Sequence, residues 1–475
     1  MAASGADGSA GRRLAGAGTL TATQDISPFA LVVLAAGKGT RMKSALPKVL
    51  HPIAGRPMIA HVLAAADGLA PARQVVIVGP GMQAVTDAVA PVRTALQIEP
   101  RGTADAVKAA LDELFGFQGT VLVLFGDTPL LTRPTLERVL QARSGPEDPA
   151  VVVIGFRTDT PGRYGRLITD GEGHLLRIVE AADLRPEDGA ADLCNSGVMA
   201  IDGRVLQRYL AAVEPANAQG EYYLTDLVAI ARADGRQTRV VIADETEVMG
   251  VDSRAALARA EAAMQARLRA AAMEAGVTLI DPDSVFLSWD TVIEPDVVIE
   301  PHVWIGPGVR IATRARIRAF SHLEGASVGR GVPVGPFARL RPGAEIAAGA
   351  HIGNFVEVKA AAVGPGAKVN HLSYIGDAEI GAGANIGAGT ITCNYDGFVK
   401  SRTVIGEGAF IGSNTALVAP VTVGDRAIVA AGSTITSDVA PDALAIARGR
   451  QTEKPGYAPG FRDRRAKAKA ERGKH

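Results

Sequence analysis

An aliphatic residue returns at every sixth position through much of the second half of the chain, and this period constrains the fold more than any other feature. The step holds at Ile293, Ile299, Ile305, Ile311, Ile317 and Leu323, then at Val334, Leu340, Ile346, Ile352 and Val358, and after some slips at Ile405, Ile411, Leu417, Val423, Val429 and Ile435. Neither an α-helix nor a half-buried strand has this period. Three such steps form one triangular turn of a coil, and each turn exposes apolar edges until the next one stacks on it. We therefore predict a β-solenoid; the alternative is chance recurrence in an apolar, glycine-rich sequence.

Length and composition fit two folded domains without a charge-driven partner. A chain of 475 residues exceeds one ordinary core. Its 50 basic and 50 acidic residues balance, so no global field recruits nucleic acid or an anionic membrane. Because no apolar run approaches the roughly 20 residues that span a bilayer, we predict no membrane insertion. Cys194 and Cys393 match no metal-ligand pattern and suit buried thiols in a reducing compartment, so we expect a cytoplasmic location.

Sequence patterns divide the chain into five segments. Residues 1–28 lack the apolar block of a secretory signal and are predicted to be a disordered tail. Alternating strands and helices over 29–252 predict an α/β domain with a Rossmann-like, mostly parallel sheet. Residues 253–276 predict one linker helix that Gly276 ends, and 277–452 form the solenoid. The Lys/Arg-rich end, 453–475, favours a solvated tail over a partner site.

A glycine-rich turn follows the first apolar strand of the α/β domain, which runs from Ala30 to Leu34. Backbone N–H groups at such a turn bind phosphate. The run AAGKGTRM at 35–42 matches neither the P-loop nor the dinucleotide fingerprint. However, Lys38, Arg41 and Lys48 bring three cations close together, and a polyphosphate would neutralise them. We predict a phosphate site here; the alternative is a solvated basic loop.

A carboxylate stands at the C-terminal end of another buried strand. Val121 to Phe125 is fully apolar and runs into Gly126 and Asp127. Open α/β sheets bind their ligands at such strand ends. Asp127 is therefore a candidate metal ligand, the alternative being a turn or cap aspartate.

Polar residues interrupt the solenoid in one region. Two pairs flank core aliphatic residues and so point outward, and further polar residues follow near a break in the step: Arg339 and Arg341, Glu357 and Lys359, then His371, Tyr374 and Asn385, and Asn394 and Tyr395 in a longer excursion at 393–402. On successive turns these side chains can converge on one groove. An imidazole suits deprotonation of an amine at cellular pH, so we predict that His371 is a general base. The alternative is a surface or packing histidine.

Six segments from both halves carry a family resemblance: LAAGKGTRM, LPKVL, GEYYLTD, GPFARLRPGAE, GNFVEVK and NIGAGTITCNYDG. They resemble the bifunctional N-acetylglucosamine-1-phosphate uridylyltransferase/glucosamine-1-phosphate acetyltransferases of bacteria, from about Leu31 to Thr452. The resemblance implies an α/β nucleotidyltransferase domain followed by a left-handed parallel β-helix of hexapeptide repeats; the period gives the coil but not its hand. The implied activity is synthesis of UDP-N-acetylglucosamine, a precursor of cell wall and lipopolysaccharide.

The resemblance implies that UTP, Mg²⁺ and N-acetylglucosamine-1-phosphate bind in the α/β domain. It assigns nucleotide contacts to Leu34, Ala35, Ala36 and Gly37, catalytic phosphate contacts to Arg41 and Lys48, uracil contacts to Gln97, Gly102 and Thr103, amino-sugar contacts to Gly165, Glu180 and Asn195, and Mg²⁺ to Asp127 and Asp252. Two residues depart from the family pattern. Asp252 replaces the usual Asn but remains a hard oxygen ligand. Asp105 stands where His is common, which puts the fine nucleotide contacts in question.

For the solenoid, the resemblance implies acetyl transfer from acetyl-CoA to glucosamine-1-phosphate, with His371 as the base. It assigns the sugar phosphate to Arg341, Glu357, Lys359, Tyr374 and Asn385, and acetyl-CoA to Ala388, Asn394, Tyr395, Ser413, Ala431 and Arg448. It also implies a homotrimer with sites between coils. Two other hypotheses compete with this one: a sugar nucleotidyltransferase whose coil only regulates or oligomerises, and a scaffold in which both sites are inactive.

Overall fold

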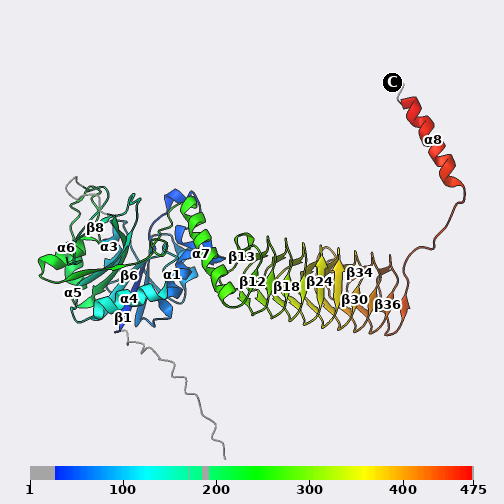
Figure 1. Cartoon of the computed structure of the whole chain (residues 1–475), viewed down its shortest axis with the longest axis horizontal. Helices are drawn as coiled ribbons and strands as arrows, with labels where there is room; N and C mark the ends of the chain where they lie inside the picture. The colour runs from blue at the N-terminus through cyan, green and yellow to red at the C-terminus, as the bar shows by residue number, and fades with distance from the viewer. Residues whose placement is uncertain (1–26, 171, 185–191, 473–475) are drawn as a thin grey trace, which may run out of the picture. The chain divides into compact units, whose positions relative to one another are not determined.

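The computed structural model describes residues 27–170, 172–184 and 192–472, which form two compact units (Figure 1). Of the described residues, the first unit comprises those up to Leu50 together with those in Met58–Ser253, and the second comprises His51–Pro57 and those from Arg254 onward. The predicted tail at 1–28 lies outside the described residues except for Ser27 and Pro28. A short piece of the N-terminal half therefore belongs to the second unit.

The first unit is built on a mostly parallel sheet with the strand order β11-β7-β10-β6-β1-β4-β5. Its strands are β1 (Phe29–Leu34), β4 (Arg73–Val78), β5 (Arg93–Leu96), β6 (Thr120–Phe125), β7 (Val151–Arg157), β10 (Leu193–Asp202) and β11 (Thr238–Ile242). Strand β10 runs antiparallel to both of its neighbours, and the other neighbours on this path are parallel. A hairpin of β8 (Arg166–Thr169) and β9 (Leu175–Val179) joins β10.

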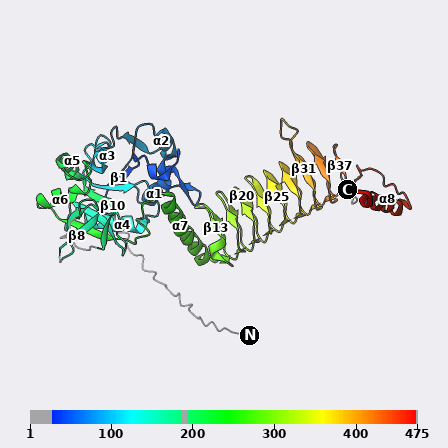
Figure 2. The same cartoon turned by 90° about the horizontal axis from the view of Figure 1, so that it is seen from above.

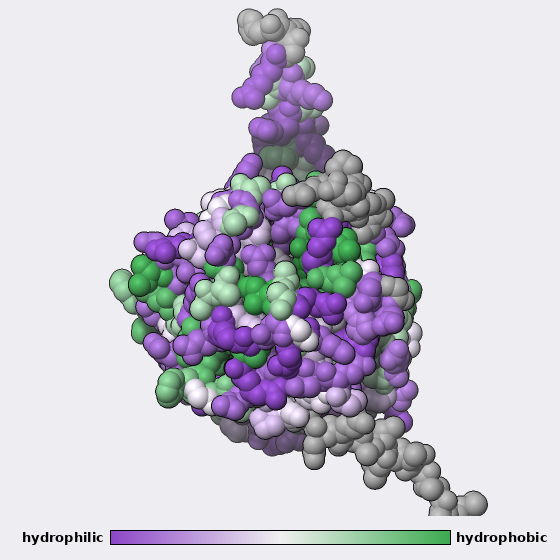
Figure 3. Space-filling view, turned by 90° about the vertical axis from the view of Figure 1, so that its left-hand side faces the viewer, coloured by the Kyte–Doolittle hydropathy of each residue, from purple (hydrophilic) through white to green (hydrophobic). Residues whose placement is uncertain are grey.

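Helices cover both faces of this sheet because its central strands are apolar on both sides. Alternate residues of β1 enter two separate cores, Val32 in one and Leu31 in the other. The core of Val32 includes residues of α3 (Thr103–Lys108), α5 (Gly203–Ala212) and α6 (Asp226–Ala233); that of Leu31 includes residues of α1 (Met58–Asp67), α2 (Gln83–Val89) and α4 (Arg133–Ser144). The result is a three-layer unit, and it confirms the predicted α/β domain with a mostly parallel sheet. The face seen in Figure 3 is mainly hydrophilic, with small hydrophobic patches.

The second unit is a left-handed parallel β-helix, whose rungs follow one another in Figure 1. Ile299 pairs with Ile317, eighteen positions later, so three six-residue steps close one turn as predicted. Its three faces are named here in chain order, starting with the face that contains β12. The first face holds β12 (Thr278–Leu279), β15 (Val298–Ile299), β18 (Arg316–Ile317), β21 (Pro333–Val334), β24 (His351–Asn354), β27 (Lys368–His371), β30 (Asn385–Ile386), β33 (Phe410–Ile411), β36 (Ile428–Val429) and β38 (Leu444–Ala445).

The second face holds β13 (Phe286–Leu287), β16 (Trp304–Ile305), β19 (His322–Leu323), β22 (Arg339–Leu340), β25 (Glu357–Lys359), β28 (Tyr374–Gly376), β31 (Ile391–Cys393), β34 (Ala416–Val418) and β37 (Thr434–Ile435). The third face holds β14 (Val292–Ile293), β17 (Arg310–Ile311), β20 (Ala326–Val328), β23 (Ala344–Ile346), β26 (Ala361–Val363), β29 (Ala378–Ile380), β32 (Thr403–Ile405) and β35 (Val421–Val423). We call the turn between the first and second faces the first edge, and the turn between the second and third faces the second edge.

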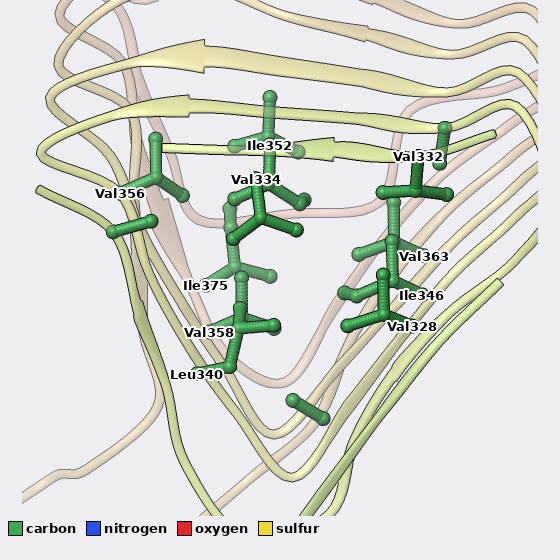
Figure 4. Packing of buried hydrophobic residues seen from close by; sticks show 14 of the residues in the cluster. Val328, Val332, Val334, Leu340, Ile346, Ile352, Val356, Val358, Val363 and Ile375 are labelled. Atoms are coloured by element: carbon green, nitrogen blue, oxygen red, sulfur yellow. The ribbon is translucent and has the colours of Figure 1, made fainter. Parts of the chain in front are cut away.

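The periodic aliphatic residues form the core of the coil. Figure 4 shows them as inward columns, one from each face: Val334 and Ile352; Leu340, Val358 and Ile375; Val328, Ile346 and Val363. Stacked identical positions bury their apolar surface against the next turn, which is why each turn needs its neighbours. Each hexapeptide contributes one residue to a column, so the six-residue period in the sequence and the triangular cross-section of the coil have the same cause.

Bulky side chains occupy strained turn positions at the first edge. Phe320, Phe337 and Phe355 have φ of 60°, 58° and 56°, a conformation rare for large residues. Their rings stack at centroid distances of 5.0 and 5.1 Å and stay about half exposed. The first edge thus carries an exposed aromatic column. The excursion at 393–402 leaves the second edge, after β31, and Figure 2 shows a loop standing out beside that strand.

A hairpin and a long helix begin the second unit. The hairpin of β2 (Pro52–Ile53) and β3 (Arg56–Pro57) contacts the helix α7 (Arg254–Glu274), where the Ala54 amide donates to Glu261 Oε2 at 2.8 Å. The Ala54 carbonyl accepts from the Trp289 amide at 2.9 Å, and the Arg56 guanidinium lies 4.2 Å from the Trp289 ring centre. At the other end, α8 (Tyr457–Arg472) has no buried residue. Within the described part of the chain, no helix has the length and apolarity that crossing a bilayer requires.

Candidate active sites

The glycine-rich turn and two strand ends line one cavity in the first unit. Strands β1 and β6 are parallel neighbours, so Leu34 and Asp127 lie at the same edge of the sheet. The cavity measures about 290 Å³, and its lining includes nine predicted nucleotide or metal contacts: Leu34, Ala35, Ala36, Gly37, Lys48, Gln97, Gly102, Thr103 and Asp127. A sheet edge of this kind is where open α/β folds bind ligands.

Two ion pairs join the predicted phosphate-binding cations to the predicted metal ligands. Lys48 pairs with Asp127, both largely buried, and the more exposed Arg41 pairs with Asp252. The Val251 amide donates to the Asp127 carbonyl at 2.9 Å, which brings Asp252 beside Asp127. Two neighbouring carboxylates offer the hard oxygen ligands that Mg²⁺ prefers, so these residues fit a divalent cation. Binding a metal and a triphosphate would exchange partners, carboxylates to metal and cations to phosphate.

The three predicted amino-sugar residues also lie together. The Asn195 amide donates to the Gly165 carbonyl at 2.8 Å, and a Cβ on Gly165 would lie 3.2 Å from Glu180 Oε2. Burial raises the pKa of Glu180, although its Oε1 accepts from the Thr225 hydroxyl at 3.1 Å. Glu180 lines a second hollow, and Thr103 lines both this hollow and the nucleotide cavity. The two hollows therefore share Thr103 in their walls.

In the second unit, one set of predicted residues gathers at the second edge. Arg341 donates to Glu357 Oε1 at 2.9 Å, and Lys359 donates to Asp377 at 3.0 Å. Asn394 donates to the Tyr374 hydroxyl at 3.4 Å and also bonds Asp377. Burial favours the protonated form of Asp377, but the hydrogen bonds from Lys359 and Asn394 outweigh burial and lower its pKa. This set is a hydrogen-bonded cluster of charged side chains, in which Arg341 and Lys359 are the groups that would bind a phosphate.

His371 lies at the first edge instead, at the end of β27. Its Nδ1 lies 2.6 Å from Oδ1 of Asn354, the residue in register with it on β24. Because an amide oxygen only accepts, Nδ1 is the donor in this contact, and in the neutral ring Nε2 is the nitrogen with the lone pair. His371 is exposed and lines a cavity of about 360 Å³ with Arg318 and His351. This geometry suits an imidazole that accepts a proton through Nε2.

Most of the predicted acetyl-CoA residues continue along the first edge from His371. Four of them follow His371, each one turn beyond the previous one and linked to it by turn-to-turn contacts: Ala388, Ser413, Ala431 and Arg448. The Ala388 carbonyl accepts from the Asn414 amide at 2.7 Å, and the Ala431 carbonyl accepts from Arg448 at 2.8 Å. Asn385 lies on the first face, in register with Lys368. Three of these four residues have small side chains, in contrast to the aromatic column that the same edge carries at Phe320, Phe337 and Phe355.

A single chain therefore divides the predicted acetyltransferase residues between two edges. Asn394 and Tyr395 follow β31 at the second edge, whereas His371 and Ser413 precede second-face strands at the first edge. Among the described residues, no hydrogen bond or ion pair joins His371 to Lys359 or Tyr374. Of the two cysteines, Cys194 is buried, which raises its pKa, and Cys393 is half-buried.

Sequence reasoning missed three residues that the structure adds to these clusters. Asp377 is the shared partner of Lys359 and Asn394, and Lys400 lies near enough to Lys359 that this neighbour lowers its pKa. Asn354 orients His371. A signal for Asn354 existed, because the repeat places it one turn before His371, but only a known register turns that spacing into a contact.

Comparison with known proteins covers both units. A family model described as a MobA-like NTP transferase domain matches residues 31–194, and one of six bacterial transferase hexapeptide repeats matches residues 402–437. The curated "Bifunctional protein GlmU" of Paramagnetospirillum magneticum is 59% identical over 94% of this chain and 99% of that protein. The protein of the same name from Rhodospirillum rubrum is 61% identical over 91% and 97%, and that from Acidiphilium cryptum 60% over 91% and 98%.

Proposed function

Because the chain belongs to the family of bifunctional GlmU proteins, we propose how its two units divide the synthesis of UDP-N-acetylglucosamine. The second unit transfers acetyl from acetyl-CoA to glucosamine-1-phosphate. The first unit transfers uridylyl from UTP to N-acetylglucosamine-1-phosphate and releases pyrophosphate, giving a precursor of cell wall and lipopolysaccharide. The observation that carries the proposal is the single cavity lined by the glycine-rich turn, Lys48 and Asp127.

In uridylyl transfer, UTP lies in the cavity with its uracil at one end and its phosphates at the other. Gln97, Gly102 and Thr103 contact uracil, while the backbone at Gly37 faces the phosphates. The sugar phosphate occupies the adjoining hollow at Glu180. Its phosphate oxygen is already a nucleophile, so attack on the α-phosphorus needs no protein base. Positioning and charge neutralisation by Lys48 and Arg41 supply most of the acceleration.

Asp127 and Asp252 would hold the Mg²⁺ ion on which this reaction depends. When bound, the ion supplies positive charge that offsets the phosphates. Lys48 and Arg41, which neutralise these carboxylates here, then become free to bind phosphate oxygens. Asp252 in place of the family's usual Asn adds one negative charge, so Arg41 has a stronger partner to leave.

In acetyl transfer, the amine of glucosamine-1-phosphate attacks the thioester carbonyl directly, the C–S bond breaks, and coenzyme A leaves as its thiol. His371 takes a proton from the amine at Nε2 while Asn354 holds Nδ1–H. Arg341, Lys359 and Tyr374 bind the sugar phosphate, and Glu357 holds Arg341 in place. The pantetheine and nucleotide of acetyl-CoA run along the first edge past Ser413 and Ala431. No cysteine nucleophile takes part, so Cys393 is a bystander.

A homotrimer completes the acetyltransferase site. The residues proposed for one site lie at two edges of a single coil, so a neighbouring copy is needed to bring Asn394 and Tyr395 to His371. The half-exposed aromatic column at the first edge offers apolar surface for that contact. Mixing His371→Ala and Asn394→Ala subunits should restore acetyl transfer; no recovery after subunit exchange would argue for a site within one chain. A cytoplasmic location, where both co-substrates are made, belongs to the same proposal.

Two reciprocal variants test the division of labour. Asp127→Ala should abolish UDP-sugar formation from N-acetylglucosamine-1-phosphate and UTP, while thiol release from acetyl-CoA continues. His371→Ala should do the opposite between pH 6 and 9. Removal of divalent metal with EDTA should reproduce the Asp127→Ala pattern in the wild type and be reversed by Mg²⁺.

Each variant controls for the folding of the other. Loss of both activities in a folded Asp127→Ala protein would contradict two separate sites. Near-normal acetyl transfer by His371→Ala would remove that residue from the base role.

A further inference from the structure

Gln97 is a buried amide whose NH₂ group is fully engaged. The residue follows β5, is 7% exposed and is anchored by its own amide to the Val78 carbonyl at 2.9 Å. Its Nε2 donates to the Gly102 carbonyl at 3.1 Å and to Asp105 Oδ2 at 2.9 Å. An NH₂ group has two protons, and both are used.

These two partners fix which way the amide faces. A backbone carbonyl and a carboxylate accept hydrogen bonds and cannot donate them. The atom between Gly102 and Asp105 must therefore be the nitrogen, which leaves Oε1 toward the cavity that Gln97 lines. No donor bonds this oxygen among the residues that the structure describes. Oε1 is an acceptor held open for a ligand.

Asp105 supplies the only side-chain acceptor of the two partners that hold the Gln97 NH₂ group. It lies in the first turn of α3 and has no ion pair among the described residues, because its neighbour Arg101 bonds Glu99. Gly102 alone would hold one proton of the amide and leave the other open. Asn at 105 could donate as well as accept, so only the Gly102 carbonyl would then oppose the flipped amide.

We propose that Asp105 is a positioning residue that sets pyrimidine selectivity by locking Gln97 Oε1 toward the base. The inference rests on the proposed uracil role of Gln97. Uracil presents N3–H, a donor that matches Oε1. Cytosine presents a lone pair at N3, so two acceptors would meet in a buried site, a mismatch that strongly favours the matched base.

The test is the ratio of kcat/KM for UTP to that for CTP in uridylyl transfer. In Asp105→Asn, which keeps the shape but loses the acceptor-only character, the ratio should fall about tenfold, mainly through a higher KM for UTP. Glu99→Gln removes an exposed carboxylate nearby and is the matched control, expected to leave the ratio unchanged. Acetyl transfer by the same protein reports that the chain is folded.

Three results separate the possibilities. A ratio unchanged in Asp105→Asn, while Gln97→Ala raises the KM for UTP, overturns the positioning role and leaves the proposed function intact. Unchanged UTP kinetics in Gln97→Ala overturn the uracil assignment and the inference with it. Should Asp105→Asn fold poorly, N3-methyl-UTP with the wild type gives a second measure: use of this analogue as readily as UTP shows that Oε1 accepts no N3–H and refutes the proposal.

Discussion

Replacing Asp202 by Asn should destabilise the first unit in a pH-dependent way. Asp202 is 0% exposed and lies against three arginines, with Nη2 of Arg143 and Arg236 each at 3.1 Å and Arg204 at 2.6 Å. Its Oδ1 also caps α5 by accepting from the Arg204 amide at 3.0 Å, a bond that Asn retains. The substitution thus removes charge while keeping the cap.

The magnitude follows from the acidity of the carboxyl group. Burial opposes ionisation, but hydrogen bonds from Arg204 and the positive charge of Arg143 outweigh it and lower the pKa from its ordinary value of 3.8 to about 2. That difference corresponds to about 2.5 kcal/mol of folding free energy at neutral pH. Because the folded pKa is below the unfolded one, this stabilisation is complete above about pH 5 and declines toward pH 2, with about 1 kcal/mol gone by pH 3.

The assay exploits an asymmetry between the units. Both tryptophans of the chain, Trp289 and Trp304, belong to the second unit, so their fluorescence follows the coil, whereas uridylyl transfer follows the first unit. Helical circular dichroism reports both units, because α7 and α8 belong to the second, and the part of its transition that tryptophan fluorescence does not share belongs to the first unit. Urea unfolding at pH 7, 5, 4 and 3 should show Asp202→Asn weaker by about 2.5 kcal/mol at pH 7 and by less at pH 3. A gap that is absent at pH 7, or equally large at pH 3, would refute the reasoning.

Two further perturbations address the coil. A Cβ added at Gly353 would lie 1.8 Å from the Asn370 carbonyl oxygen, so Gly353→Ala should destabilise the second unit by about 3 kcal/mol in tryptophan-detected unfolding. In the control Gly449→Ala, the new Cβ meets nothing within 4 Å, and the stability should not change. Equal unfolding midpoints for the two variants would contradict the clash. Asn354→Ala frees the His371 ring and should lower kcat of acetyl transfer about ten- to hundredfold with uridylyl transfer unchanged; an unaltered kcat would mean that the 2.6 Å contact does not orient the base.

Much of the fold could be predicted because periodicity determines it. A six-residue step predicts a coil of stacked turns, although not its hand, and Ile352 and Val358 point inward for the same reason at every turn. Apolar strands that run into Ala35 and Asp127 likewise predicted the edge of the sheet at which the cavity lies. The hairpin at 52–57 was not predicted as part of the second unit, because its partners, Glu261 and Trp289, lie more than 200 positions away.

The candidate sites were predicted less evenly. Lys48 and Asp127 announce themselves as charges beside apolar or glycine-rich runs, and the structure pairs them. Asn354 and Asp377 act through register, which links residues one turn apart and leaves no local mark in the sequence. Asp105 was noticed only as a departure from a family pattern; its contact with Gln97 supplies a physical reason for it.

The hairpin at 52–57 has a consequence for modularity. Its Ala54 carbonyl and amide are both satisfied by the linker helix or the first turn of the coil, and it follows Lys48 by only a few residues. No single cut in the chain therefore separates the two units cleanly, because a cut after Ser253 leaves the hairpin of the second unit on the fragment that contains the first unit. An exchange of first units between relatives would also exchange this hairpin, and it would have to include the hairpin's partners in α7 and at the start of the coil. We therefore expect the two units to have diverged together.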